Sequence, residues 1–329
     1  MDQKVTNISG LNSNNESLIQ EIQTAELITT AVGLAILPRI APVIAKGIIL
    51  RKSAGVTNPL NIIACENGIR ASTQLKAEVL KHLNSEETAY VEQYVGFPDC
   101  SVDRIVPPVK SENFTDVVVE SFFEWNVEKD SFKGKVPDIS GMNMADNLIA
   151  YIERKLFTLN TGHAITAYLG YLKGYQTIDE SIGDEKIYAI VKSAMRESGM
   201  GLIEKYGFNQ DTHFQYIDKI INRLKNPMLK DDLTRVCREP LRKLSPDDRL
   251  IKPLLIARNY GFGVENLVLG IGAALHYENA DDKQSTQLQL LIREKGLKAA
   301  VAEVTNIDPN DGLLDDIQLA YHSIKTKLQ

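Results

Sequence analysis

The stretch "LITTAVGLAILPRIAPVIAKGIILRKSAGVTNPLNIIACEN", residues 27–67, decides the fold of the first half of the chain. It begins with a short apolar run, LITTAVG, and ends with a second one, LNIIACEN, and the segment between them has a helical pattern. Short apolar strands that alternate with helices are typical of a parallel sheet with both faces buried. The stretch therefore predicts a strand–helix–strand unit of an α/β domain.

Part of this stretch is also the only candidate in the sequence for a membrane span. Residues 27–50 contain Arg39, Lys46 and the prolines Pro38 and Pro42. A transmembrane helix of about 20 apolar residues does not normally carry such residues. The sequence instead predicts a buried strand, a turn and a helix here, and we expect no membrane association.

Length, charge and cysteine content limit the class of protein. With 329 residues, of which 43% are hydrophobic, the chain has enough material for about two domains. A formal charge of −6 argues against a general nucleic-acid surface. The three cysteines, Cys65, Cys100 and Cys237, are widely spaced and form no CxxC pair, which favours free thiols in a reducing compartment. With no secretion signal in the sequence, we expect a cytoplasmic protein.

The pattern of apolar residues changes near Asp146. Before it, strand and helix signals alternate, and two later strands are expected in "SVDRIVPP", residues 101–108, and "TDVVVESFFEWNVE", residues 115–128, the latter partly exposed. After it, apolar residues recur every three or four positions, which indicates helices. We therefore predict a Rossmann-like α/β domain over residues 1–140 and an all-helical catalytic and substrate domain over residues 141–329.

Two glycine-containing segments superficially resemble the dinucleotide fingerprint G-x-G-x-x-G. They are "GFGVEN", which begins at Gly261, and "GIGAAL", which begins at Gly270. Both lack the third glycine and lie in the helical half, whereas the fingerprint requires a strand before it and a helix after it. We expect these glycines to serve in turns and in helix packing.

The segment "ERKLFTLNTGHAITAYLGYLKG", residues 153–174, carries three polar groups on one predicted helix. Lys155, Asn160 and His163 follow the spacing K-x4-N-x2-H. On an α-helix Asn160 would lie about 140°, and His163 about 80°, around the axis from Lys155, so all three can face one cleft. A desolvated lysine can act as a general acid/base, and asparagine and histidine can hold a reacting oxygen. The alternative is structural, with an exposed lysine head group, a capping asparagine and a hydrogen-bonded core histidine.

A fourth polar residue, Asn67, follows the second apolar strand in "ACENGIRASTQLK". The carboxyl ends of parallel strands form the edge at which α/β sheets bind ligands. Asn67 is therefore a candidate ligand-binding residue, and the alternative is that it caps the next helix.

These segments, together with "TTAVG", "NIIACEN", "VGFPDCSVDRIVPP" and "NPMLKDDLTRVCREPLRKLSPDDRLIKPL", resemble the polyol-specific long-chain dehydrogenases over essentially the whole chain. The resemblance implies that Lys155 is the general acid/base and that Asn160, His163 and Asn67 bind the reacting oxygen. It also implies NAD as cofactor, no metal, and the interconversion of D-mannitol 1-phosphate and D-fructose 6-phosphate. Other functions that the residues leave open are oxidation of a free polyol or sugar acid and a non-catalytic sugar-phosphate-binding role.

A basic run in the helical half suits a phosphate dianion, because arginine side chains bind phosphate in a bidentate manner. The helix is expected to break at Pro240, so these residues need not share one face. The alternative is a solvated basic surface paired with Asp231, Asp232 and Asp247. The basic residues are Lys230, Arg235, Arg238, Arg242 and Lys243.

The first residues, "MDQKVTNISG", do not match the family pattern of a strand, a glycine-rich turn and a second strand with an acidic end. We therefore expect an incomplete nucleotide-binding sheet and weak NADH binding. The part of the cofactor site that the sequence retains is the TTAVG loop, Thr29, Thr30, Ala31, Val32 and Gly33. The oligomeric state is not indicated.

Overall fold

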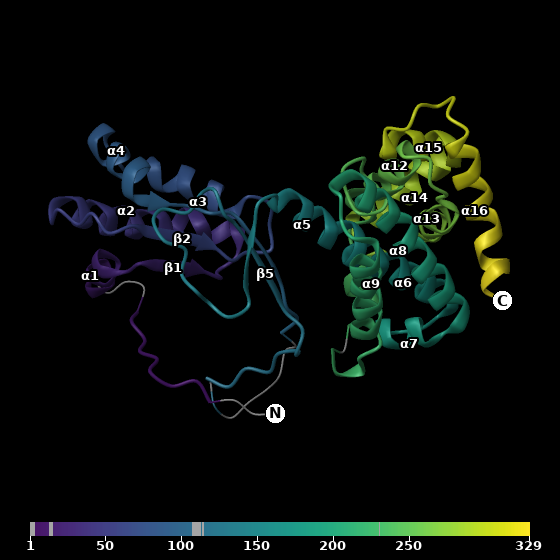
Figure 1. The fold of residues 1–329 in the computed structure, drawn as a ribbon. Helices are drawn as coiled ribbons and strands as arrows, with labels where there is room; N and C mark the ends of the chain where they lie inside the picture. Colours follow the sequence, from purple (N-terminus) through teal and green to yellow (C-terminus); the bar gives the residue numbers. More distant parts are fainter. Residues whose placement is uncertain (1–3, 13–15, 107–112, 114, 230) are drawn as a thin grey trace. The chain divides into compact units, whose positions relative to one another are not determined.

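The computed structural model describes residues 4–12, 16–106, 113, 115–229 and 231–329 (Figure 1). The chain divides into two compact units. The first comprises Met1–Ile105 with Val119–Tyr151, and the second comprises Val106–Val118 with Ile152–Gln329. The first contains a parallel sheet and the second is helical, which confirms the predicted fold class.

The parallel sheet of the first unit has the strand order β1 (Leu27–Thr30), β2 (Leu60–Ala64), β3 (Val95–Gly96). β1 and β2 are joined by a 3-10 turn, Leu34–Ile36, and the helix α2, Leu37–Ser53. The strand–helix–strand unit predicted for residues 27–67 is therefore confirmed. No helix in the described part of the chain is long and apolar enough to cross a bilayer.

Helices cover one face of this sheet. α2 packs against α1 (Ser17–Thr24), α3 (Ala71–Leu80) and α4 (Ser85–Tyr94), and their apolar side chains form one core with Ile62 of β2. All five residues of β2 are buried, as expected for a strand that is covered on both faces.

The opposite face of β2 is covered by a second sheet. Its strands are β4 (Cys100–Asp103), β5 (Glu124–Glu128) and β6 (Met142–Ala145), with β4 antiparallel and β6 parallel to β5. Ile63 of β2 packs against Cys100 and against Val127 in β5. Because successive residues of a strand point to opposite faces, Ile62 and Ile63 join the two layers of the unit.

The strand predicted for residues 115–128 is only partly correct. β5 covers its last five residues, whereas Val117, Val118 and Val119 are 75%, 50% and 39% exposed and belong to no strand. β-branched residues favour a strand only where a neighbouring strand and a core receive them. The strand predicted for residues 101–108 ends at Asp103, and its last two residues lie outside the described part of the chain.

The second unit consists of helices and short helical turns. In chain order they are α5 (Leu148–Arg154, which bridges the boundary between the units), a π-helical turn η2 (Lys155–Asn160), α6 (Thr161–Lys173), α7 (Ile178–Gly183), α8 (Glu185–Tyr206), α9 (Gln210–Leu224), a 3-10 turn η3 (Pro227–Leu229), α10 (Leu233–Cys237), α11 (Pro240–Lys243), α12 (Ile251–Asn259), α13 (Glu265–Ala274), α14 (Lys283–Lys295), α15 (Leu297–Thr305) and α16 (Leu313–Leu328).

α6 is the central helix of this unit. It packs against α7, α8, α10 and α13, and residues 164–170 are all buried. Small residues allow this close packing, because a Cβ at Gly162 would lie 2.5 Å from the sulfur of Met195, and one at Gly270 would lie 2.6 Å from Ile165. Gly270 therefore serves in helix packing, as predicted, and Gly261 has a φ of +80° in the turn after α12.

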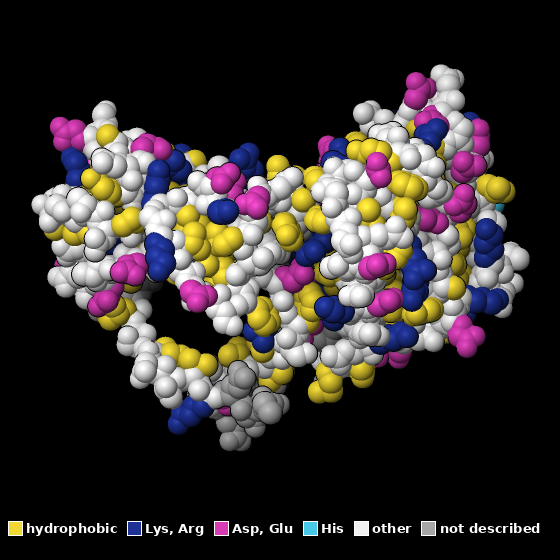
Figure 2. Space-filling model, viewed as in Figure 1, with side chains coloured by type: hydrophobic (Ala, Val, Ile, Leu, Met, Phe, Trp, Pro, Cys, Tyr) yellow, Lys and Arg dark blue, Asp and Glu magenta, His cyan; other side chains and the backbone are white. Residues whose placement is uncertain are grey.

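Pro240 breaks the helix as predicted, since α10 ends at Cys237 and α11 begins at Pro240. Between them Glu239 adopts a left-handed conformation with φ of +60°, which is uncommon for a residue other than glycine. On the face shown in Figure 2, acidic and basic side chains of the described residues are interspersed over both units.

Candidate active site

Lys155 and Asn160 are the first and last residues of the π-helical turn. The spacing between them is therefore the i→i+5 spacing of a π-helix, which places both on the same side of the turn. The separation of about 140° expected for an α-helix is wrong, because the chain has locally one residue more per hydrogen-bonded turn. Single π-turns within α-helices occur frequently at functional sites.

Hydrogen bonds from neighbouring helices hold this turn in place. The Ser198 hydroxyl on α8 donates to the carbonyl of Phe157 at 2.6 Å. The Thr161 hydroxyl donates to the carbonyl of Arg249 at 2.6 Å, and it also lies 3.3 Å from the carbonyl of Leu156. The carbonyl of Phe157 in the turn therefore has a fixed partner on α8, and Thr161 connects the end of the turn to the segment before α12.

The side chains of the K-x4-N-x2-H motif are partly buried. Asn160 occupies the N-cap position of α6, but its side chain makes no capping hydrogen bond. His163, in the first turn of α6, lies with Nε2 2.7 Å from Oδ2 of Asp231. Asn160 therefore does not cap α6 through its side chain, as the structural alternative would have it. His163 is held by a carboxylate that precedes α10.

Asn67 and TTAVG lie in the first unit, where Thr29 and Thr30 end β1, the remaining residues of TTAVG follow it, and Asn67 comes three residues after the end of β2. The N-cap of α3 is Arg70, so Asn67 does not cap that helix. The residue before it, Glu66, is buried and accepts hydrogen bonds from the Thr30 hydroxyl at 2.8 Å and from the backbone of Val32 at 2.9 Å and Gly33 at 2.7 Å.

Glu66 therefore organises the loop that the sequence assigns to the cofactor. Burial acts to raise the pKa of its carboxyl, but the hydrogen bonds from Val32, Thr30 and Gly33 outweigh burial and keep the pKa below its ordinary value. The carboxylate stays ionised and fixes the carboxyl ends of the two strands against each other. Sequence reasoning missed Glu66, although an acidic residue at the end of an apolar strand was a visible signal.

The candidate phosphate residues lie in one network with His163. Arg235 binds Asp231, with Nε 3.0 Å from Oδ1. Nε of Arg238 donates to the carbonyl of Arg235 at 3.3 Å, and the buried Lys243 ammonium donates to the carbonyl of Arg238. Lys230 lies outside the described residues.

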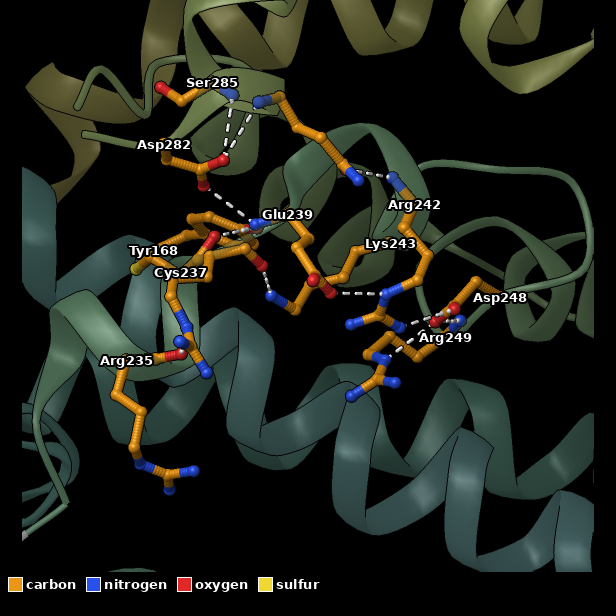
Figure 3. Close-up of polar contacts among 12 residues, drawn as sticks. Tyr168, Arg235, Cys237, Glu239, Arg242, Lys243, Asp248, Arg249, Asp282 and Ser285 are labelled. Carbon is orange, nitrogen blue, oxygen red and sulfur yellow. Dashed lines mark hydrogen bonds and ion pairs between the residues drawn. The ribbon is translucent and has the colours of Figure 1, made fainter. Parts of the chain in front are cut away.

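Acidic residues neutralise part of this network (Figure 3). Arg242 binds Glu239 at 2.8 Å and Asp248 at 2.9 Å, and Asp248 also binds Arg249 at 2.7 Å. In the described part of the chain, Arg238 is paired with no carboxylate within 4 Å. The expected alternative of a paired basic surface thus applies to some residues of the run and not to Arg238.

The pKa of the Lys243 ammonium is lowered by its surroundings in this cluster. Burial, followed by the nearby guanidinium groups of Arg249 and Arg242, lowers the pKa of its ammonium to about 8. A lysine becomes easier to deprotonate where the local potential is positive and solvent is excluded. The lowered pKa of Lys243 therefore reflects its burial first and the two neighbouring guanidinium charges second.

A buried histidine lies beside the π-turn. His213 is 2% exposed, and its ring stacks on Phe208 with 5.9 Å between centroids. Neither of its ring nitrogens has a hydrogen-bond partner within the described residues. Burial, and secondly the charge of Arg154 just before the turn, lowers the pKa of His213 to about 4.

We expect His213→Phe to reduce the loss of stability in acid. Between pH 6.5 and pH 4 the unfolded chain binds a proton at this residue and the folded chain does not, so the free energy of unfolding falls as pH falls through this window. Between pH 7.5 and pH 5 the free energy of unfolding of the wild type should fall by about 2 kcal/mol more than that of His213→Phe. Urea unfolding at both pH values measures it, with the exposed His322→Phe as control. An unchanged pH dependence in His213→Phe would contradict the prediction.

Among the described residues, no group of three or more His, Cys, Asp and Glu side chains is arranged to hold a metal ion. The polar groups that the motif provides are a lysine ammonium, an amide and an imidazole fixed by a carboxylate. Such groups can transfer a proton and orient a hydroxyl group.

Comparisons with known proteins agree with this chemistry. Residues 1–141 match the family model described as the mannitol dehydrogenase Rossmann domain, and residues 147–325 match that of the mannitol dehydrogenase C-terminal domain. A mannitol 2-dehydrogenase of Pseudomonas fluorescens, solved as a ternary complex with NAD and D-mannitol, is 19% identical. The alignment covers 95% of this chain and 76% of that chain, with a TM-score of 0.66. A substrate-free D-sorbitol dehydrogenase is 16% identical, with coverages of 95% and 77% and a TM-score of 0.80. The chain therefore belongs to the mannitol dehydrogenase family of NAD-dependent polyol oxidoreductases.

Proposed function

We propose that this protein is a mannitol-1-phosphate 5-dehydrogenase, which interconverts D-mannitol 1-phosphate and D-fructose 6-phosphate with NAD. The observation that carries the dehydrogenase chemistry is the π-turn, which places Lys155 and Asn160 on one side, with His163 in the next helical turn. The phosphate specificity is supported by Arg238, which has no carboxylate partner among the described residues, beside the buried Lys243.

Different residues of the chain transfer the proton, orient the substrate and bind its phosphate. In the direction of oxidation, neutral Lys155 accepts the proton of the reacting hydroxyl. The amide of Asn160 and the ring of His163 orient the hydroxyl groups of the substrate. In the direction of reduction, protonated Lys155 returns the proton to the carbonyl oxygen. The basic cluster binds the phosphate at the opposite end of the six-carbon chain.

The first unit offers a surface that fits the cofactor. Near the carboxyl ends of β1 and β2, Val32, Leu34 and Ile69 are 45%, 37% and 60% exposed. Gly33 has a φ of +91°, and no atom lies within 4 Å of the position of an added Cβ. Exposed apolar side chains at this edge suit a flat nicotinamide ring. When bound, NAD supplies the hydride acceptor for oxidation and the hydride donor for reduction.

A free polyol is the second candidate substrate. The pairs Asp231–Arg235, Glu239–Arg242 and Asp248–Arg242 neutralise part of the basic run, which favours a substrate without a phosphate. The two structural neighbours are named for mannitol and sorbitol, which carry none.

One assay separates these candidates. The purified chain is given NADH with fructose 6-phosphate or with fructose, and NADH consumption is followed. The proposal expects a kcat/KM for fructose 6-phosphate that is at least about tenfold higher, the contribution of one charged hydrogen bond. Equal values would support a free-polyol enzyme. No turnover with either substrate, together with no NADH binding, would contradict the dehydrogenase proposal.

A further inference from the structure

Asp231 uses both oxygens of its carboxylate to connect two residues of the candidate site. Oδ2 lies 2.7 Å from Nε2 of His163, and Oδ1 accepts from Nε of Arg235 at 3.0 Å and also from its Nη2. The side chain is largely buried, with 11% of its surface exposed, and that of His163 has 16%. Asp231 is therefore neither a surface residue nor a simple partner of the basic run.

The backbone around Asp231 is fixed by the start of α7. The carbonyl of Asp231 accepts from the backbone of Ile178 at 3.0 Å, and Leu233 donates to the carbonyl of Gln176 at 2.9 Å. Thr177 and Asp232 form an antiparallel bridge between these hydrogen bonds. The carboxylate is consequently held at a fixed place against α6, from which His163 projects.

The ionisation of Asp231 determines what it can do to His163. Burial acts to raise the pKa of the Asp231 carboxyl, but the hydrogen bonds that it accepts from His163 and Arg235, together with the guanidinium charge of Arg235, outweigh burial, so the pKa lies below its ordinary value. An ionised carboxylate accepts hydrogen bonds and cannot donate them. The hydrogen atom shared with Oδ2 must therefore be carried by Nε2 of the imidazole.

We propose that Asp231 is a positioning residue of the active site, which holds His163 in the Nε2–H tautomer and leaves Nδ1 as the acceptor for a substrate hydroxyl. A polyol carries a hydroxyl on every carbon, so an acceptor of fixed orientation selects how the chain of the substrate lies beside Lys155. In a neutral imidazole one nitrogen donates and the other accepts, and the partner of one nitrogen determines the role of the other. The expected effect of Asp231 on kinetics rests on the proposed dehydrogenase function, whereas the expected tautomer of His163 does not.

The tautomer is measured first, in the full chain without substrate. Nitrogen-15 NMR of labelled histidine distinguishes protonated from unprotonated ring nitrogens, and His163→Ala identifies the signals. We expect Nε2–H in the wild type at pH 7.5. In Asp231→Asn the amide can offer either its oxygen or its NH2 group to Nε2, so a mixture of tautomers is expected. Asp232→Asn, the same change at the exposed neighbouring residue, should keep the wild-type spectrum.

Kinetics then test whether the tautomer matters. Asp231→Asn should lower kcat by on the order of 10- to 100-fold, as for carboxylates that orient metal-binding histidines, with a smaller change in KM. In a His163→Ala background the same change should cost little more, because Asp231 acts through His163.

Three results would overturn the inference. They are an Nδ1–H tautomer in the wild type, an unchanged single tautomer in Asp231→Asn, and fully additive losses in the double variant. Circular dichroism checks that each variant is folded, and the wild-type spectrum decides the tautomer even if Asp231→Asn fails to fold. If the chain proves not to be a polyol dehydrogenase, the tautomer measurement still tests the position of Asp231.

Discussion

Replacement of Lys155 by alanine is expected to lower kcat for the polyol at least about 100-fold, the lower limit of general acid/base contributions. Lys155 begins a π-turn in which the carbonyl of Phe157 accepts a hydrogen bond from the hydroxyl of Ser198. The backbone from which the Lys155 side chain extends is thus held by packed helices, and water cannot replace an oriented amine as proton acceptor. Steady-state rates with saturating polyol and NAD measure the loss.

Two further variants distinguish proton transfer from charge and from stability. Lys155→Arg keeps the positive charge but cannot deprotonate near neutral pH, so it should be as inactive as Lys155→Ala. Lys186→Ala, at an exposed position of α8 in the same unit, should keep wild-type activity. If Lys155→Ala retained more than about a tenth of the wild-type kcat, Lys155 would not be the general acid/base.

Much of the fold could be predicted from local patterns. The apolar runs around Ile28 and Ile62 and the helix between them correspond to β1, α2 and β2. β2 is fully buried and mostly apolar, as expected for a strand covered on both faces, whereas β1 is only partly buried. The valines at 117–119 show where this reasoning fails. They have the same local pattern as a strand, but no strand among the described residues pairs with them.

The residues of the candidate site could be found from the sequence, but their geometry could not. Periodicity assigns a helix and assumes about 100° per residue, so it cannot detect the one additional residue of the π-turn between Lys155 and Asn160. That turn depends on distant hydrogen-bond donors such as Ser198. The contact of Asp231 with His163 joins residues 68 positions apart, and no local pattern predicts it.

The basic run shows the same limit. Its sequence indicated an anion site, but which arginine is available depends on where the carboxylates lie. Asp231 and Asp248 pair with Arg235 and Arg242, whereas Asp247 pairs with Lys252, outside the run. The distribution of charge within the cluster is therefore a property of the three-dimensional structure, and it favours Arg238 as the phosphate ligand.

Replacement of Arg238 by alanine is the second large effect that we expect. Its guanidinium is exposed and donates to a backbone carbonyl, and in the described part of the chain no carboxylate neutralises it. A lost hydrogen bond to a charged phosphate oxygen is worth roughly 1.5–3 kcal/mol, or about 10- to 150-fold in affinity. The kcat/KM for fructose 6-phosphate should fall by this factor, and that for fructose should stay near its wild-type value.

Arg242→Ala is the matched comparison, because it removes the same side chain four residues further on. Glu239 and Asp248 already neutralise Arg242, so its loss should change the preference for the phosphorylated substrate less than the loss of Arg238 does. The ratio of the two kcat/KM values is the decisive quantity, since a general loss of folded enzyme lowers both values equally and leaves their ratio unchanged. An unchanged ratio in Arg238→Ala would remove Arg238 from the phosphate site. An unchanged ratio in both variants would favour a free polyol as the substrate.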